Sequence, residues 1–129
     1  SSAIFEGGVD ILETIIMNFE GNKMATLQSG VREISDRMGS IFGTKGYIQV
    51  QNINNPEKIT VFNQDHEETA SYFPPKQITG YEYEVRACKK ALEEGKIECP
   101  EMPHAETVRI MEIMDGLRKS WGYEIPEVE

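Results

Sequence analysis

Residues 80–127 read GYEYEVRACKKALEEGKIECPEMPHAETVRIMEIMDGLRKSWGYEIPE, and this stretch decides the fold because it predicts two amphipathic helices joined by a short link. Thr79 and Glu82 form a T-x-x-E capping box, which pairs backbone N–H groups that the first turn of a helix leaves unsatisfied. Gly95 follows the first helix, where a left-handed C-cap is favoured. Gly122 is placed to close the second helix in the same way.

Each predicted helix carries an apolar face at helical spacing. In the first helix this face consists of Tyr81, Val85 or Cys88, and Leu92. The second helix follows Pro103, and its apolar face consists of Ile110, Ile113, Met114, Leu117 and Trp121. We interpret both faces as core that packs against a sheet.

The first half of the chain is typical of β-structure, and it begins with two hairpins. Residues 9–19 and 24–31 are strand-like, and Gly21 and Asn22 between them are able to take a positive φ, which predicts a two-residue turn. A second hairpin is expected over residues 39–50, because a Gly43-Thr44-Lys45-Gly46 turn separates two further strand-like runs.

Two more short strands are expected, over residues 58–62 and 67–73. Strands followed by two helices predict the α+β class, with a mainly antiparallel sheet and both helices packed on one of its faces. A length of 129 residues is that of one domain of ordinary size, so residues 1–129 are interpreted as a single domain.

The run 9–19 is apolar on both faces, which is unusual for a strand with one side in water. Ile11, Ile15 and Met17 alternate onto one face, whereas Leu12 and Ile16 point to the other. Since two helices can cover only one face, we expect the other to be covered by a partner subunit or by a further domain. Leu12 and Ile16 are the candidate interface residues, and either face is open to this role.

The net charge of −9 is unfavourable for binding to nucleic acid phosphates and to anionic membranes, since no basic patch offsets it. No apolar run approaches the ~18 residues of a membrane span, and no signal peptide is recognised, so a cytoplasmic location is expected.

Cys88 is interpreted as a small buried hydrophobe. A disulfide with Cys99 is the less favoured alternative, because a reducing compartment is expected. His66 and His104 are interpreted as a solvated turn residue and a helix-cap residue.

Several segments, taken in order, resemble the C-terminal domain of the glucose–fructose oxidoreductase/inositol dehydrogenase family (Gfo/Idh/MocA). The hairpin I-F-G-T-K-G-Y-I at 41–48 and the preceding F-E-G-N-K-M-A-T-L-Q-S at 19–29 are similar to two hairpins of that domain. The segments at 80–85, 95–107 and 113–122, with the tail at 123–126, are similar to its closing helices. The resemblance covers residues 9–127 and is greatest for the subgroup of dihydrodiol-dehydrogenase-like and sugar-reductase-like members.

The resemblance implies an enzyme whose catalytic parts lie elsewhere in the polypeptide. Family members hold NAD or NADP in an N-terminal Rossmann domain, and their C-terminal sheet shapes the substrate pocket and commonly mediates dimerisation. This chain has no G-x-G-x-x-G run. The family's catalytic E-K-P string has as its nearest counterpart Pro56-Glu57-Lys58, in another order, and no Asp-x-x-x-His pair is present. We therefore expect no catalytic residue, no bound cofactor and no metal in this chain.

The same resemblance points to two candidate substrate-lining residues. Arg32 begins the segment REISDRM, and a loop of this kind approaches the mouth of the active site in the family. Arg32 could bind a sugar hydroxyl or a carboxylate, with a plain surface arginine as the alternative. Tyr81 is the second candidate for the pocket wall, with a core position as the alternative.

Two functions from different classes follow. In the first, the chain is the C-terminal part of an NAD(P)-dependent oxidoreductase that acts on a sugar, a polyol or a related carbonyl compound. It then contributes pocket wall and homodimer interface, and it is inactive alone. In the second, the chain is a free-standing α+β module that binds a protein or a small ligand. A beginning at strand-like Ala3-Ile4-Phe5 favours the first.

Overall fold

The structure is a computed structural model of the chain, and it describes residues 1–123. It contains two compact units. The first unit consists of Ser1–Glu33 together with the chain from Pro100 onwards, and the second consists of Ile34–Cys99. The interpretation of residues 1–129 as a single domain stays a prediction. Residues 124–126 of the family-like tail lie outside the described residues.

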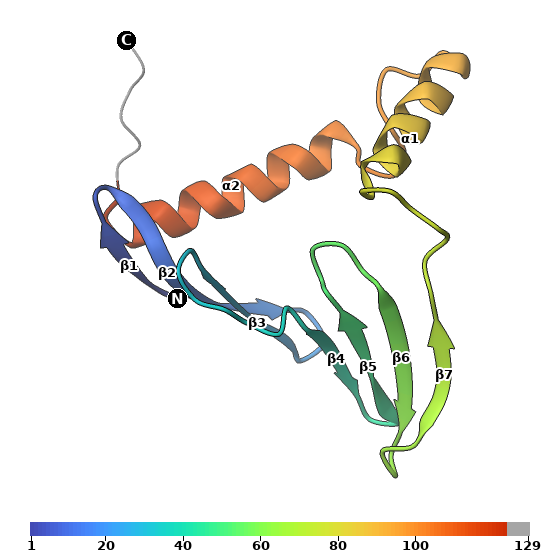
Figure 1. The fold of residues 1–129 in the computed structure, drawn as a ribbon. Helices are drawn as coiled ribbons and strands as arrows, with labels where there is room; N and C mark the ends of the chain where they lie inside the picture. The colour runs from blue at the N-terminus through green and yellow to red at the C-terminus, as the bar shows by residue number, and fades with distance from the viewer. Residues whose placement is uncertain (124–129) are drawn as a thin grey trace. The chain divides into compact units, whose positions relative to one another are not determined.

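The first unit holds a three-stranded antiparallel sheet in the order β1-β2-β3 and one helix (Figure 1). Its elements are β1 (Ser2–Glu6), β2 (Val9–Phe19), β3 (Lys23–Gly30) and α2 (His104–Ser120). The predicted positive φ is confirmed at Gly21 (72°) and Asn22 (57°). The connection has three residues in place of two, because Phe19 pairs directly with Lys23.

The second unit holds a four-stranded antiparallel sheet in sequential order and the other helix (Figure 1). Its elements are β4 (Gly39–Gly43), β5 (Gly46–Gln51), β6 (Lys58–Asn63), β7 (Glu68–Tyr72) and α1 (Tyr81–Glu93). The predicted hairpin is confirmed, with Thr44 and Lys45 as its turn. Gly46 is required there, since its φ is 145° and a Cβ would lie 2.0 Å from the carbonyl oxygen of Phe62.

The α+β class with antiparallel strands is thus confirmed. The structure adds that the strands form two separately hydrogen-bonded sheets, with one helix in each unit. No helix among residues 1–123 combines the length and the apolar character that crossing a bilayer requires.

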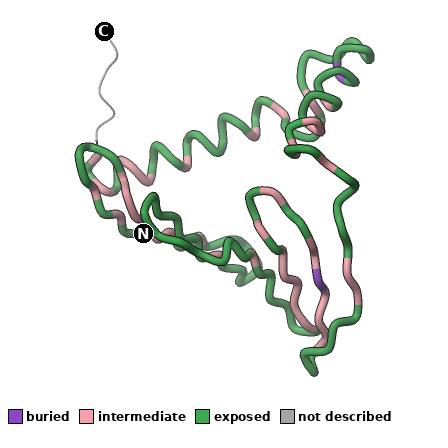
Figure 2. Tube along the Cα trace, viewed as in Figure 1, coloured by how far each residue is buried: buried purple, intermediate pink, exposed green. Residues whose placement is uncertain are grey.

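Very little of the chain is buried (Figure 2). Among the described residues, only Thr60 and Ala91 fall below a tenth of their maximal exposure. The chain exposes 10872 Å², whereas two separate compact proteins of half its mass would together expose about 8,300 Å². Many large apolar side chains therefore remain exposed to solvent in both units.

The C-terminal half of α2 makes the contacts of that helix in the first unit. Ile113, Leu117 and Trp121 are half-buried, in agreement with the predicted face, while Ile110 and Met114 stay 37% exposed. The Trp121 ring meets the ring of Phe5 on β1 edge-on, with centroids 6.3 Å apart. The end of α2 is thus joined to β1 through Trp121, and no residue of the helix itself is fully buried.

The apolar face predicted for the first helix is wrong. Tyr81, Val85 and Leu92 are 70%, 68% and 76% exposed, and Cys88 is exposed as well. The covered side of α1 instead carries Tyr83, Ala87 and Ala91. On this side, polar contacts join α1 to the chain before and after it. The backbone N–H of Lys96 reaches the carbonyl of Ala91, and the Tyr83 hydroxyl donates to the carbonyl of Pro75.

Both predicted glycine caps are confirmed. Gly95 has a φ of 69° and Gly122 a φ of 74°. After α1, the N–H of Gly95 donates to the Leu92 carbonyl at 3.0 Å, and that of Lys96 to the Ala91 carbonyl at 2.8 Å, which is the Schellman arrangement. These two bonds turn the chain sharply back along the helix.

Gly95→Ala is expected to lower the free energy of unfolding by roughly 1 kcal/mol, because a Cβ disfavours this left-handed φ although it meets no atom within 4 Å. Gly116→Ala is the matched control. Gly116 lies inside α2 at an ordinary φ in equally open space, so its replacement should stabilise by about 0.8–1 kcal/mol. Urea unfolding followed by circular dichroism measures both, and two changes of the same sign would contradict the cap.

Candidate functional site

The second unit contains a hollow of about 500 Å³ at the N-terminal end of α1. Three segments of the chain build it: the β5–β6 loop, the stretch after β7, and the first turn of α1. Its lining residues are Asn54, Asn55, Pro56, Pro74, Gln77, Thr79, Gly80, Tyr81, Tyr83 and Glu84.

Asn55 ties the three segments together. Its side-chain oxygen accepts a hydrogen bond from Gln77 Nε2 at 2.9 Å, and its Nδ2 donates to the carbonyl of Thr79 at 3.4 Å. Gly80 passes directly beside it with a φ of 94°, where a Cβ would lie 3.0 Å from Asn55 Oδ1. Glycine at position 80 therefore allows the loop to approach the helix, and the amide pair Asn55–Gln77 holds it there.

The predicted capping box is confirmed at the rim of the hollow. The Glu82 carboxylate accepts hydrogen bonds from the backbone N–H groups of Ile78, Thr79 and Gly80, at 2.5, 3.3 and 2.9 Å. Thr79 Oγ1 accepts from the N–H of Tyr81 at 3.3 Å. The donors, led by the N–H of Ile78, lower the pKa of Glu82 to about 2.

This pKa predicts an acid-sensitive contribution to stability. Because the folded pKa lies below the unfolded value of about 4.3, the stabilisation from Glu82 is present above that value and is lost as the pH falls toward 2. Glu82→Gln should therefore lose less stability between pH 6 and pH 3 than the wild type does. Urea melts at both values test this, with Glu84→Gln in the same turn as the control. A Glu82→Gln profile that parallels the wild type would contradict the assignment.

The lining of the hollow offers groups for hydrogen bonding and for apolar contact. Its lining offers amide groups, hydroxyl groups and aromatic rings, with Glu84 as the one charged group among the described lining residues. Amides and hydroxyls donate and accept hydrogen bonds, and aromatic rings cover apolar faces of a ligand. A ligand that carries several hydroxyl or carbonyl oxygens suits this lining. Within residues 1–123, no cluster of three or more His, Cys, Asp or Glu is placed to hold a metal.

The two candidate substrate-lining residues lie in different units. Tyr81 lines the hollow, and its ring is 70% exposed, so its alternative position in the core is excluded. Arg32 belongs to the first unit, where both of its terminal nitrogens lie 2.8 Å from the Glu6 carboxylate oxygens. This ion pair is more than half exposed and contributes little stability. The substrate-lining role stays a prediction for both residues.

The candidate interface residues lie on one face of the first sheet. Ile16 is 53% exposed and Leu12 is half-buried. Leu12 pairs with Ile4 on β1, which is 55% exposed, so the three side chains share this face. The opposite face carries three half-buried residues, Ala3, Glu13 and Ile15. Glu13 on this face interacts electrostatically with Arg118 on α2. The structure thus identifies the Leu12–Ile16 face as the one that α2 leaves open.

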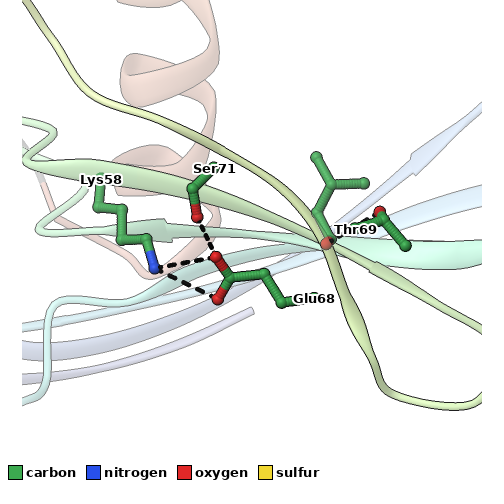
Figure 3. A network of polar contacts seen from close by, with 5 residues as sticks. Lys58, Glu68, Thr69 and Ser71 are labelled. Atoms are coloured by element: carbon green, nitrogen blue, oxygen red, sulfur yellow. Dashed lines mark hydrogen bonds and ion pairs between the residues drawn. The ribbon is translucent and has the colours of Figure 1, made fainter.

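Lys58, the lysine of the Pro56-Glu57-Lys58 string, has a structural role in the second sheet. Figure 3 shows its ammonium group beside the Glu68 carboxylate, at 3.4 Å, with the Ser71 hydroxyl donating to the same carboxylate. The bonds from Ser71 and Lys58 lower the pKa of Glu68. The neighbouring Thr69 is the extra residue of a β-bulge, and its hydroxyl donates to the Val61 carbonyl at 3.2 Å.

His66 lies in a solvated turn as the sequence predicts, whereas the N-cap of α2 is Pro103 and no side chain caps this helix. His66 is exposed in the β6–β7 turn, with a φ of 62°, and His104 is the first residue of α2. Sequence analysis did not identify Asn55 or Gln77. Both stand in stretches that read as ordinary loops, and the glycine beside the capping box was the available signal that a second segment approaches closely there.

The comparisons with known proteins relate the chain to oxidoreductases of the dehydrogenase class. No family model matches it. In particular, the chain is similar to trans-1,2-dihydrobenzene-1,2-diol dehydrogenases. The Mus musculus protein is 26% identical over 134 residues, covering 96% of this chain and 38% of the relative. The Xenopus laevis protein is 30% identical over 132 residues, covering 95% and 39%. The Homo sapiens protein is 25% identical over 127 residues, covering 95% and 38%.

These relatives are oxidoreductases of the Gfo/Idh/MocA type, so the resemblance seen in the hairpins and helices is confirmed. The chain spans about two fifths of the length of the curated relatives that it matches. A match of that size is consistent with one domain of such a protein.

Proposed function

We propose that this chain is the C-terminal, substrate-side domain of an NAD(P)-dependent oxidoreductase that acts on a diol, a sugar, a polyol or a related carbonyl compound. The observation that carries this proposal is the similarity of 95–96% of the chain to dihydrodiol dehydrogenases. The mixed lining of the hollow supports it, since amide and hydroxyl groups beside tyrosine rings suit ligands that carry both oxygens and carbon faces.

The cofactor itself does not fit this chain. A Rossmann pyrophosphate site needs free N–H groups and close-packed glycines where a helix begins. At the beginning of α1, the Glu82 carboxylate occupies the N–H groups of Ile78, Thr79 and Gly80. The helix α2 begins after Pro103, in a stretch without glycine. The nucleotide and the groups that transfer hydride therefore belong to another part of the polypeptide, and this chain supplies a wall of the substrate pocket.

The second role is subunit contact. The open face of the first sheet presents Ile4, Leu12 and Ile16, and Met24 on the same face is 69% exposed. Apolar surface in water costs about 25 cal/mol per Å². A second copy of the chain, placed on this face by two-fold symmetry, covers it with the same residues. We accordingly infer a homodimer through this sheet face.

The isolated chain should show no saturable binding of NAD, NADP or their reduced forms by titration calorimetry, and no dehydrogenase activity. The reason is the absence of the glycine-rich run from the sequence and the occupied beginning of α1. Micromolar, saturable binding of any of the four nucleotides would overturn the assignment of the cofactor to another domain.

A hybrid enzyme tests the positive half of the proposal. This chain replaces the aligned portion of the Xenopus laevis relative, and oxidation of diols and polyols is measured with NAD and with NADP. Turnover is expected, and Asn55→Ala in the hybrid should raise KM more than it lowers kcat, because it loosens the hollow. Glu57→Ala, on the same loop outside the lining, is the control. A hybrid that binds NAD or NADP but oxidises none of these compounds would contradict the substrate-side role.

A further inference from the structure

Two cysteines that stand apart in the sequence meet in the second unit. Cys88 lies on the outer side of α1 and is exposed, and Cys99 is half-buried in the link after it. Their sulfur atoms are 3.7 Å apart. The Schellman turn at Gly95 reverses the chain, and the link then runs back along α1 until Cys99 reaches the helical turn that carries Cys88. The helix cap therefore sets the distance between the two thiols.

We propose that Cys88 and Cys99 are a redox-responsive pair, which closes into an intramolecular disulfide in the presence of a peroxide or a low-molecular-weight disulfide. A disulfide needs sulfur atoms about 2.05 Å apart. The structure already brings the two sulfur atoms to 3.7 Å, so closure of the bond needs only a short further approach. This inference is independent of the proposed oxidoreductase function.

The chemistry balances with hydrogen peroxide as the oxidant. The thiolate of Cys88, the more exposed of the two, attacks one peroxide oxygen and breaks the O–O bond. Cys88 becomes a sulfenic acid, and the hydroxide that leaves takes up a proton to give water. The thiolate of Cys99 then attacks the Cys88 sulfur and expels hydroxide, which takes up a proton to give a second water. Two thiols lose two electrons in total, and one peroxide gains them. A thiol reductant reverses the reaction by exchange.

The bond would act on the exit of the chain from the second unit. Cys99 is the last residue of that unit, and Pro100 is the first residue of the segment that returns to the first unit. A disulfide to α1 would close a loop around the Gly95 cap and would remove freedom from the unfolded chain. The oxidised form should therefore keep α1 helical at higher urea concentrations than the reduced form does.

Peptide mapping of the full chain after treatment with hydrogen peroxide tests the pair. The expected result is loss of both thiols in dithionitrobenzoate titration, a mass lower by two hydrogens, and a Cys88–Cys99 crosslinked peptide that dithiothreitol cleaves. The same treatment of urea-unfolded chain is the control for proximity, and there the crosslink should form more slowly. Equal rates in the folded and unfolded chain would overturn the role of the fold.

The single variants separate the two cysteines. Cys88→Ser should keep Cys99 as a thiol under conditions that crosslink the wild type, because the exposed partner that reacts first is gone. Cys99→Ser should leave Cys88 as a sulfenic acid, which dimedone traps, since its resolving thiol is missing. Crosslinks between chains, or separate oxidation of both cysteines to sulfinic acids in the wild type, would refute the pair.

Discussion

Ile15→Glu is expected to lower the free energy of unfolding by about 2–3 kcal/mol, whereas the neighbouring Ile16→Glu is expected to leave the first unit folded. The two side chains point to opposite faces of β2. Ile15 is half-buried on the face that carries Glu13 and receives α2, while Ile16 is 53% exposed on the open face. Urea unfolding measured at low protein concentration distinguishes the two variants without a contribution from self-association.

The same pair of variants tests the homodimer. Wild-type chain should self-associate at tens of micromolar in sedimentation equilibrium, because Ile4, Leu12 and Ile16 present one apolar surface. Ile16→Glu should shift it to monomer, since two carboxylates would face each other across a two-fold axis. A wild-type chain that stays strictly monomeric would contradict the interface and leave a further domain as the cover for this face.

Trp121→Ala should destabilise the first unit by about 2–3 kcal/mol, somewhat less than the 3–5 kcal/mol typical of a fully buried ring. The indole is half-buried, meets Phe5 edge-on, and donates from Nε1 to the Ser1 hydroxyl at 3.1 Å. The ring of Tyr123 stacks on the ring of Phe5, with the two centroids 5.3 Å apart. Phe5 contacts both other rings, so the cluster connects the end of α2 to β1, and removal of the indole should loosen this connection.

Thr107→Ala is the matched control, because Thr107 lies on an exposed part of α2 and should change stability by less than about 0.5 kcal/mol. Urea unfolding of both variants, followed by circular dichroism, makes the comparison. Equal losses for Trp121→Ala and Thr107→Ala would show that the covered side of α2 is assigned incorrectly.

Local signals predicted the elements well where one backbone conformation strongly favours one residue type. Gly21, Asn22 and Gly95 all adopt the positive φ expected of them. The capping box at Thr79 and Glu82 forms as the spacing predicts, and it places the beginning of α1 at Tyr81. These features depend on neighbours within a few residues, so no tertiary contact is needed to infer them.

The packed side of α1 was not predictable in this way. The helix has large apolar residues on one side, such as Val85 and Leu92, and small ones, Ala87 and Ala91, on another. Periodicity favours the side with the larger hydrophobes. In the structure the small side is the covered one, with Ala91 5% exposed, and Val85 and Leu92 on the large side face outward.

In the candidate site, too, some residues were predictable from local sequence and others were not. The capping box and Gly80, which shape the rim of the hollow, are readable from spacing alone. Asn55 and Gln77, which close it, are brought together from loops 22 residues apart, and neither loop has a pattern that names its partner. A polar contact between distant loops has no characteristic residue spacing, so the sequence pattern does not predict it.

By itself, the sequence determined the α+β class, the hairpins, the helix ends and the relationship to dehydrogenases, because each of these rests on local spacing or on ordered short motifs. The tertiary structure decided which face of each amphipathic element is covered. It also decided that Asn55 meets Gln77 and that Cys88 meets Cys99. The reason is that a backbone conformation depends on near neighbours, whereas burial and side-chain contact depend on segments that only the folded chain brings together.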